Sequence, residues 1–153
     1  MELPAQLFHG ELGGFGLFNE HGVPQANYAA LKAFRMLLEA SSRRQTAGSV
    51  PGQLAIASGV DSEGLGATIL VANYADRRKR FQLEMARSPW KGRTSIRIEK
   101  LEGRSGFRPE PAIRLASRSL RLKLDLETPG VALIHLQAER PSPEKGRSGR
   151  DDP

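Results

Sequence analysis

The pattern of hydrophobic and polar positions along this chain changes its period after residue 52. Before that point, apolar residues recur at the spacing of a helix, and this predicts a helix over residues 24–40. Pro24 suits the first position of such a helix, where its missing N–H is not needed. The apolar stripe of the predicted helix consists of Tyr28, Leu31, Phe34 and Leu38.

Beyond residue 52 the period becomes two, as expected for strands with one buried face. The clearest case is residues 120–127, where four leucines alternate with charged residues. Residues 67–74 are nearly all apolar, which predicts a central strand covered on both faces. The other expected strands lie at residues 53–60, 81–85, 95–99 and 131–136.

Short polar segments separate these strands. Residues 61–64 and 128–130 have the composition of turns, and residues 76–80 are expected to form a charged turn. Residues 103–117 are less regular and are expected to form a long connection. Six short strands joined by turns, with no helices between them, predict a mainly β protein with the fold of an antiparallel β-sandwich.

Composition divides the chain into four parts. Residues 1–42 combine a Gly- and Phe-rich stretch with the predicted helix, residues 43–52 resemble a linker, and residues 53–139 hold the sandwich. Residues 140–153 are rich in Pro, Gly and charge, and we expect them to be disordered. The 153 residues suffice for one domain and its core, but not for a closed (β/α)8 barrel of about 250 residues.

The net charge of +6 lies mainly on residues 53–139, which carry fifteen Lys and Arg against ten Asp and Glu. A basic surface can attract nucleic acid or anionic lipid. Because these charges alternate with apolar residues, a solvated basic face is the preferred interpretation, and we do not expect nucleic acid as a partner. No apolar run approaches the ~20 residues that span a bilayer, so no membrane association is expected.

Few residues offer recognisable chemistry. The chain has no cysteine, and its three histidines lack the spacing of metal ligands, so we assign no metal site. Trp90 is a candidate surface for stacking a sugar or a base, although a single Trp is more often an anchor at the edge of a core. Arg77, Arg78 and Arg80 are candidate phosphate contacts, although such a basic run is more often a polar turn.

A longer motif near the N-terminus resembles a known family. Residues 8–17 read FHGELGGFGL and residues 22–28 read GVPQANY. This resembles the end of the catalytic barrel in glycoside hydrolase family 39, the β-xylosidase and α-iduronidase family. There, a Phe-His-Gly-Gly-Phe-Gly-Leu loop follows the eighth strand, and Gly-Ile-Pro-Lys-Pro-x-Tyr opens the eighth helix. Here, Glu11-Leu12 is inserted into the loop and Gln25-Ala26 replaces Lys-Pro.

The resemblance implies a fold and a parent activity. Residues 1–42 would be the last loop and helix of a (β/α)8 barrel, followed by the family's β-sandwich. The family's retaining mechanism uses two glutamates about 5 Å apart, and they lie on the fourth and seventh barrel strands. Neither strand is present here, so we assign no catalytic residue and expect this chain alone to be inactive. The resemblance implies no cofactor.

Two residues are candidate sugar contacts by resemblance. His9 corresponds to the histidine of the family's loop, at the barrel face where active sites are built, although a His beside glycines is often only packed. Glu2 corresponds, at a shorter spacing, to an acidic residue upstream of that loop. Asn19-Glu20 is similar to the family's Asn-Glu-Pro, but His21 replaces the proline and the position follows the eighth strand. We therefore interpret Glu20 as a solvated loop residue.

Two functions remain open at this stage. The first is a C-terminal fragment of a β-xylosidase-like hydrolase, which would bind a glycoside only as part of a full barrel. Such a fragment would leave the helix face through Leu31, Phe34 and Leu38 exposed and available for self-association. The second is a stand-alone β-sandwich that binds carbohydrate or a polyanion. The start Met1–Pro4 lacks the pattern of a signal peptide, but a truncated chain would also lack it, so the compartment stays open.

Overall fold

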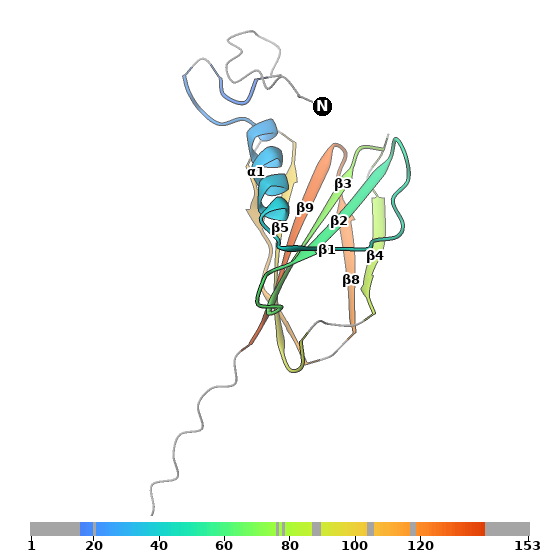
Figure 1. Cartoon of the computed structure of the whole chain (residues 1–153). Helices are drawn as coiled ribbons and strands as arrows, with labels where there is room; N and C mark the ends of the chain where they lie inside the picture. Colours follow the sequence, from blue (N-terminus) through green and yellow to red (C-terminus); the bar gives the residue numbers. More distant parts are fainter. Residues whose placement is uncertain are drawn as a thin grey trace, which may run out of the picture.

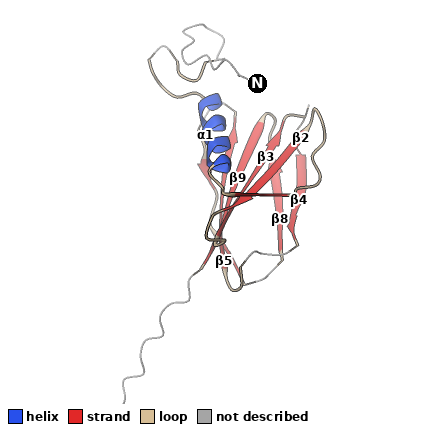
Figure 2. Ribbon diagram, viewed as in Figure 1, coloured by secondary structure: helices blue, strands red, loops and turns tan. Residues whose placement is uncertain are grey.

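The computed structural model is mainly antiparallel β-structure with one helix (Figure 2). It describes residues 16–19, 21–75, 77, 79–86, 90–103, 106–116 and 119–139. The expectation of disorder over residues 140–153 lies outside this range. The elements are α1 (Ala26–Leu38), β1 (Ser42–Arg44), β2 (Leu54–Val60), β3 (Gly66–Asn73), β4 (Lys79–Met85), β5 (Thr94–Glu102), β6 (Arg108–Pro109), β7 (Ile113–Leu115), β8 (Leu120–Leu126) and β9 (Gly130–Ala138).

The strands form two sheets. The large sheet has seven strands in the order β1-β2-β3-β9-β5-β6, with β7 also paired to β5, and the small sheet consists of β4 and β8. Every pair is antiparallel. The small sheet packs on one face of the large sheet and α1 lies on the other (Figure 1). The prediction of an antiparallel β-sandwich is thereby confirmed.

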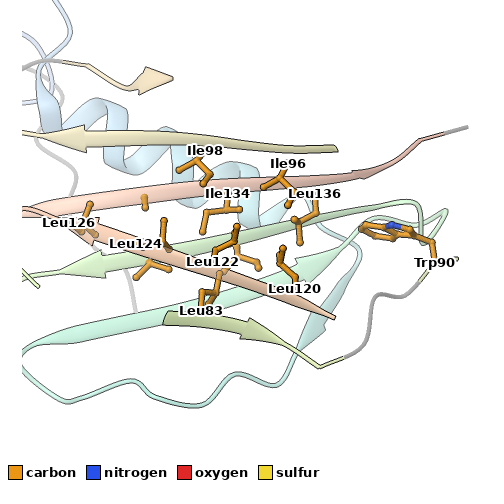
Figure 3. Packing of buried hydrophobic residues seen from close by; sticks show 13 residues of the cluster. Leu83, Trp90, Ile96, Ile98, Leu120, Leu122, Leu124, Leu126, Ile134 and Leu136 are labelled. Atoms are coloured by element: carbon orange, nitrogen blue, oxygen red, sulfur yellow. The ribbon is translucent and has the colours of Figure 1, made fainter. Parts of the chain in front are cut away.

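The core lies between the two sheets. On β8, Leu120, Leu122, Leu124 and Leu126 all point inward, as their alternation with charged residues predicted. They meet isoleucines of β5 and β9, among them Ile98 and Ile134 (Figure 3). The charged residues between the leucines, such as Arg121, remain on the outer face. One-sided burial of this kind is the main source of stability in a sandwich.

Large apolar residues are buried on both faces of β9 and of β5, through Ile98 and Leu101, but not of β3. The apolar run at residues 67–74 does form an inner strand, flanked by β2 and β9. However, Ile69 and Val71 of β3 are buried while Leu70 is only half-buried. On β9, Ile134 faces the sandwich core and Leu133 is buried on the opposite face. The expectation of two-sided burial therefore holds for the last strand, which the sequence did not single out.

The helix covers the outer face of the large sheet, against β2, β3 and β5. It begins at Ala26 rather than at Pro24, which instead forms an isolated bridge with Phe18. Its contact with the sheet is close at Gly59 of β2, where an added Cβ would lie 2.5 Å from the Cβ of Ala40. A residue without a side chain is therefore required at this position for the helix end to rest on the sheet.

Some segments expected as connections contain short strands. Ser42–Arg44, at the start of the expected linker, pairs with the end of β2. The segment after it continues along β2, because Thr46 Oγ1 donates to the Ile56 carbonyl and the Ile56 N–H donates to Ser49 Oγ. The unpaired backbone groups of an edge strand explain this pairing, since they need hydrogen-bond partners. Similarly, β4 begins at Lys79, inside the expected charged turn, and β6 and β7 lie within the expected long connection.

Asn73 at the end of β3 joins the two sheets. It is buried, and its Nδ2 donates to the carbonyls of Leu126 and Glu127, both at 3.0 Å, and to that of Arg77 at 3.3 Å. Its Oδ1 accepts from the Ala75 N–H at 3.3 Å. The Asn73 side chain therefore links the end of β3 in the large sheet to the segment before β4 and to the end of β8 in the small sheet.

Candidate interaction surfaces

The candidate residues named from the sequence do not gather into one site. Glu2, His9 and Arg78 lie outside the described residues. Trp90 is only 7% exposed and belongs to the core cluster, and its Nε1 donates to Thr94 Oγ1 at 2.9 Å. A buried indole offers no face for a sugar or a base, so in this structure Trp90 is an anchor of the core and not a stacking surface.

Two basic residues of the expected turn, Arg77 and Arg80, are exposed. Arg80 lies on the outer face of β4, and its Nε is 3.3 Å from Asp125 Oδ2 on β8. Arg77 lies just before β4, with its side chain in solvent. Exposed ion pairs of this type contribute little stability. Arg80 already has an anionic neighbour, which lowers its suitability as a phosphate contact.

The most distinctive surface is the outward face of α1. Leu31, Phe34 and Leu38 are 51%, 46% and 51% exposed, whereas Ala33 and Leu37, on the face toward the sheet, are fully buried. Tyr28 extends the outward face by one turn and contacts Phe18, with ring centroids 5.0 Å apart and the ring planes tilted by 48°. The expected exposure of this apolar face is confirmed. A helix with apolar residues on both faces is typical of one packed between two partners.

A small polar pocket lies where the end of α1 meets β3 and β9. It has a volume of about 210 Å³, and its lining includes Glu39, Asp61 and His135. The Nε2 atom of His135 is buried and has no hydrogen-bond partner among the described residues. Burial, and secondarily the positive charge of Arg97, lower the pKa of His135 below its ordinary value of 6.5. No pattern in the sequence indicated this pocket, because its residues come from three separate segments.

The lowered pKa of His135 predicts a pH-dependent stability. The folded protein binds fewer protons here than the unfolded chain, so this stability is fully present above pH 6.5 and is lost as the pH falls through the folded-state pKa. His135→Gln should flatten the decline of unfolding free energy below pH 6.5, measured by urea titration at several pH values. His21→Gln provides the matched control, since it removes an imidazole from an exposed position and not from the interior. If the unfolding free energy of His135→Gln declined below pH 6.5 as steeply as that of the unchanged protein, His135 would not be the cause of the decline.

A larger, apolar groove opens between the two sheets at the edge formed by β2 and β4. Its volume is about 1030 Å³. The segment 44–48 and β2 form one side, and Phe81 through Met85 of β4 form the other. The groove exists because the small sheet has only two strands and leaves part of the large sheet uncovered. Several of its apolar side chains, such as Ile56 and Phe81, are consequently only half-buried.

Two further classes of site are absent from the described part of the chain. No group of three or more His, Cys, Asp or Glu side chains there could hold a metal ion. Within the same residues, no helix has the length and apolar character needed to cross a bilayer.

Comparison with solved structures identifies this fold in glycoside hydrolases. The chain matches a glucosidase from Croceicoccus marinus with a TM-score of 0.72 and 17% identity, over 82% of this chain and 34% of that one. It matches the GH39 enzyme from Xanthomonas axonopodis pv. citri with a TM-score of 0.65 and 15% identity, over 89% and 34%. It matches a monomeric β-xylosidase from Caulobacter crescentus CB15 with a TM-score of 0.56 and 16% identity, over 88% and 34%.

These matches concern the fold alone, because the identities are low. No protein-family model and no curated protein matches the chain. The chain spans about a third of the length of each of the three solved structures. The resemblance to glycoside hydrolase family 39 drawn from the loop and helix motifs is confirmed at the level of fold.

Proposed function

We propose that this chain is the C-terminal part of a retaining, β-xylosidase-like glycoside hydrolase of family 39, comprising its last barrel unit and its accessory β-sandwich. The observation that carries the proposal is the outward apolar face of α1, formed by Tyr28, Leu31, Phe34 and Leu38. In this proposal α1 is the eighth barrel helix, with its outward face packed against the remainder of the barrel. The fold that it shares with about a third of the length of two solved glycoside hydrolase chains supports the same origin.

The size of the apolar face favours a large partner over a second copy of this chain. Stable dimers bury about 800 Å² on each partner. One face of a 13-residue helix, about 20 Å long, offers a narrow strip with four large apolar side chains. Self-association through this strip is therefore expected to be weak. In a barrel, the neighbouring elements on either side of α1 would bury this strip.

In this proposal the chain has no catalytic pair of its own. Retaining hydrolysis needs a nucleophile and an acid/base about 5 Å apart, and the family resemblance locates both glutamates on barrel strands that precede this chain. The sandwich would stabilise the barrel, and the glycoside would be bound only by the full protein. His9 and Glu2 would contribute at the edge of that site.

The decisive experiment compares this chain with a longer product, in which the sequence encoded upstream of the Met1 codon is joined to this chain. If an upstream frame encodes a barrel with Asn-Glu-Pro and a second strand-end glutamate, the joined product should hydrolyse an aryl β-xyloside while the short chain should not. Hydrolysis by the short chain alone, retained after removal of the upstream frame, would contradict the proposal. An upstream region with stop codons and a promoter would contradict it as well.

The helix face gives a direct test on the short chain. Replacing Leu31, Phe34 and Leu38 together by serine should reduce self-association and dye binding to exposed apolar surface, with little change in the unfolding midpoint. The face is already solvated, so little burial is lost. Leu37→Ser is the matched control on the opposite face, and it should destabilise the fold by about 2 to 5 kcal/mol because Leu37 is fully buried. If the triple variant unfolded as readily as Leu37→Ser, the outward face would already be covered.

The alternative function, a stand-alone module for carbohydrate or polyanion, has less support. Its carbohydrate form relied on Trp90, which is buried. Its polyanion form relied on a basic face, yet ion pairs partly neutralise this face by linking Arg97 to Glu99 and Arg121 to Glu84. Heparin binding that weakens steeply as the salt concentration rises would support the polyanion-binding alternative.

A further inference from the structure

The polar pocket at the end of α1 combines several sources of negative charge. Two carboxylate residues line it, Glu39 at the C-cap of α1 and Asp61 in the turn between β2 and β3. The helix also ends here, at Leu38, and a helix C-terminus carries a partial negative charge that favours a cation. Because the chain as a whole has a net charge of +6, a pocket with this lining is a local exception.

Asp61 provides a fixed carboxylate without a positive partner. Its Oδ1 accepts a hydrogen bond from the Leu65 N–H at 2.9 Å, which holds the carboxylate in place. Among the described residues, no Lys or Arg forms an ion pair with it. Glu39, by contrast, lies 3.0 Å from Arg35 Nε at an exposed position. The charge of Asp61 is therefore not neutralised within the described part of the fold.

The lack of a side chain at Gly66 leaves room for two acceptor oxygens. A Cβ added there would lie 2.5 Å from Asp61 Oδ2 and 3.1 Å from Gln137 Oε1. Both oxygens therefore approach the same point beside the backbone of Gly66. A cationic N–H donor at this point can bond to both, and hydrogen bonds that involve a charged donor and acceptor are the stronger kind.

His135 lines the same pocket without opposing a cation. Burial, and secondarily the charge of Arg97, lower the pKa of His135 below 6.5, so its imidazole is largely uncharged at neutral pH. Its buried Nε2 has no hydrogen-bond partner among the described residues. Arg97, which pairs with His135 across the β5–β9 ladder, is itself 3.0 Å from Glu99. These groups therefore add hydrogen-bonding capacity to the pocket without an unpaired positive charge.

The size and position of the pocket suit a basic side chain. Its volume of about 210 Å³ is below the roughly 300 to 1,000 Å³ that is usual for small-molecule sites. Met36 and Ala40 also line it, so the aliphatic stem of a lysine or arginine would gain apolar contacts. Glu39 directly follows Leu38, the last residue of the outward apolar face of α1, which is 51% exposed. A polypeptide that covers this face therefore ends beside the pocket.

We propose that this pocket binds the protonated amine or guanidinium group of a Lys or Arg side chain, supplied by the polypeptide that covers the outward face of α1. The cation bonds to Asp61 Oδ2 and Gln137 Oε1, and its aliphatic stem lies along Met36. The identity of that polypeptide, the remainder of the barrel, rests on the proposed function. Binding of the cation by the pocket does not.

The test titrates this chain with n-butylammonium, which reproduces the end of a lysine side chain. The amide signals of Leu65, Gly66 and Gln137 are followed by NMR at neutral pH and constant ionic strength. They should shift saturably, with half-occupancy at about 10 mM for so small a ligand. n-Butanol has the same number of heavy atoms but no charge, and it should need about ten times the concentration. No saturable shift up to about 100 mM, or an equal response to n-butanol, would overturn the proposal.

Two variants in the same turn provide a matched comparison. Asp61→Asn keeps the shape and the acceptor for the Leu65 N–H but removes the charge, so half-occupancy should rise about tenfold. Glu63→Gln removes an exposed carboxylate outside the pocket lining and should change half-occupancy by less than about twofold, because exposed charges are screened. Equal effects of the two variants would overturn the proposal. Displacement of the amine by a lower concentration of calcium would overturn it in favour of an inorganic cation. The comparison with n-butanol stays decisive if Asp61→Asn fails to fold.

A second measurement separates the source of the cation from the site that binds it. In the longer joined product, a side chain of the barrel should already occupy the pocket, so n-butylammonium should leave the Leu65 and Gly66 amide signals unchanged. A response equal to that of this chain would exclude the barrel as the source of the cation. If no barrel is encoded upstream, the proposed function fails, whereas the titration of this chain still decides whether the pocket binds a cation.

Discussion

Replacing Asn73 by alanine is expected to lower the free energy of unfolding by about 3 to 5 kcal/mol. The side chain is 1% exposed and donates to three carbonyls, of which those of Leu126 and Glu127 belong to the end of β8. Alanine would remove the bonds to these carbonyls and the acceptor of the Ala75 N–H, of which the bonds to Leu126 and Ala75 are buried. Each buried polar group left unpaired costs about 1 to 3 kcal/mol.

Urea unfolding followed by circular dichroism measures this loss. Asn73→Asp is the informative companion, because it keeps the shape and the acceptor for Ala75 but removes the donors to the carbonyls. It should destabilise the protein at least as much as alanine, since it adds a buried charge. Gln82→Ala, exposed on β4, should change the unfolding free energy by less than about 0.5 kcal/mol. A loss below about 1 kcal/mol for Asn73→Ala would mean that water replaces the lost bonds.

Replacing Ile134 by alanine is expected to cost about 2 to 5 kcal/mol. Ile134 is fully buried at the centre of β9, where it pairs with Ile69 of β3 and Ile98 of β5 and faces the leucines of β8. Removing its side chain opens a cavity that strands fixed on both sides cannot close. The same urea titration measures the effect.

Two comparisons make the cavity interpretation specific. Ile134→Val should cost only about 0.5 to 1.5 kcal/mol, because it removes a single methyl group. Gln137→Ala, at an exposed position of the same strand, should be close to neutral. If Ile134→Ala cost no more than Ile134→Val, the core around β9 would be free to collapse, contrary to its dense packing.

The apolar face of α1 and the groove beside β4 lie on opposite sides of the large sheet. Figure 1 shows α1 on the side of the large sheet away from β4 and β8. Serine substitutions on α1 should therefore leave the packing between the two sheets unchanged.

The six longer strands and the fold class could be predicted from the sequence alone. The alternation at Leu120–Leu126 defined a one-sided strand, and similar alternation located β4 and β5, because side chains on a strand point alternately to its two faces. The motif around Pro24 and Tyr28 indicated the family resemblance, and the comparison of folds agrees with it. The outward apolar stripe of α1 was also predicted, although the sequence did not reveal that Leu37 carries the contact with the sheet.

Which faces meet and which remain open depends on the tertiary fold. Burial on the outer face of the large sheet depends on α1, whose contacts reach β5 some sixty residues further along the chain. The core cluster that includes Trp90, the pocket at His135 and the groove beside β4 likewise combine segments distant in sequence. Periodicity reports only which side of a strand is apolar, whereas the partner of that side is fixed by strand order and layer packing. The candidate interaction surfaces therefore could not be read from the sequence, although the elements that carry them could.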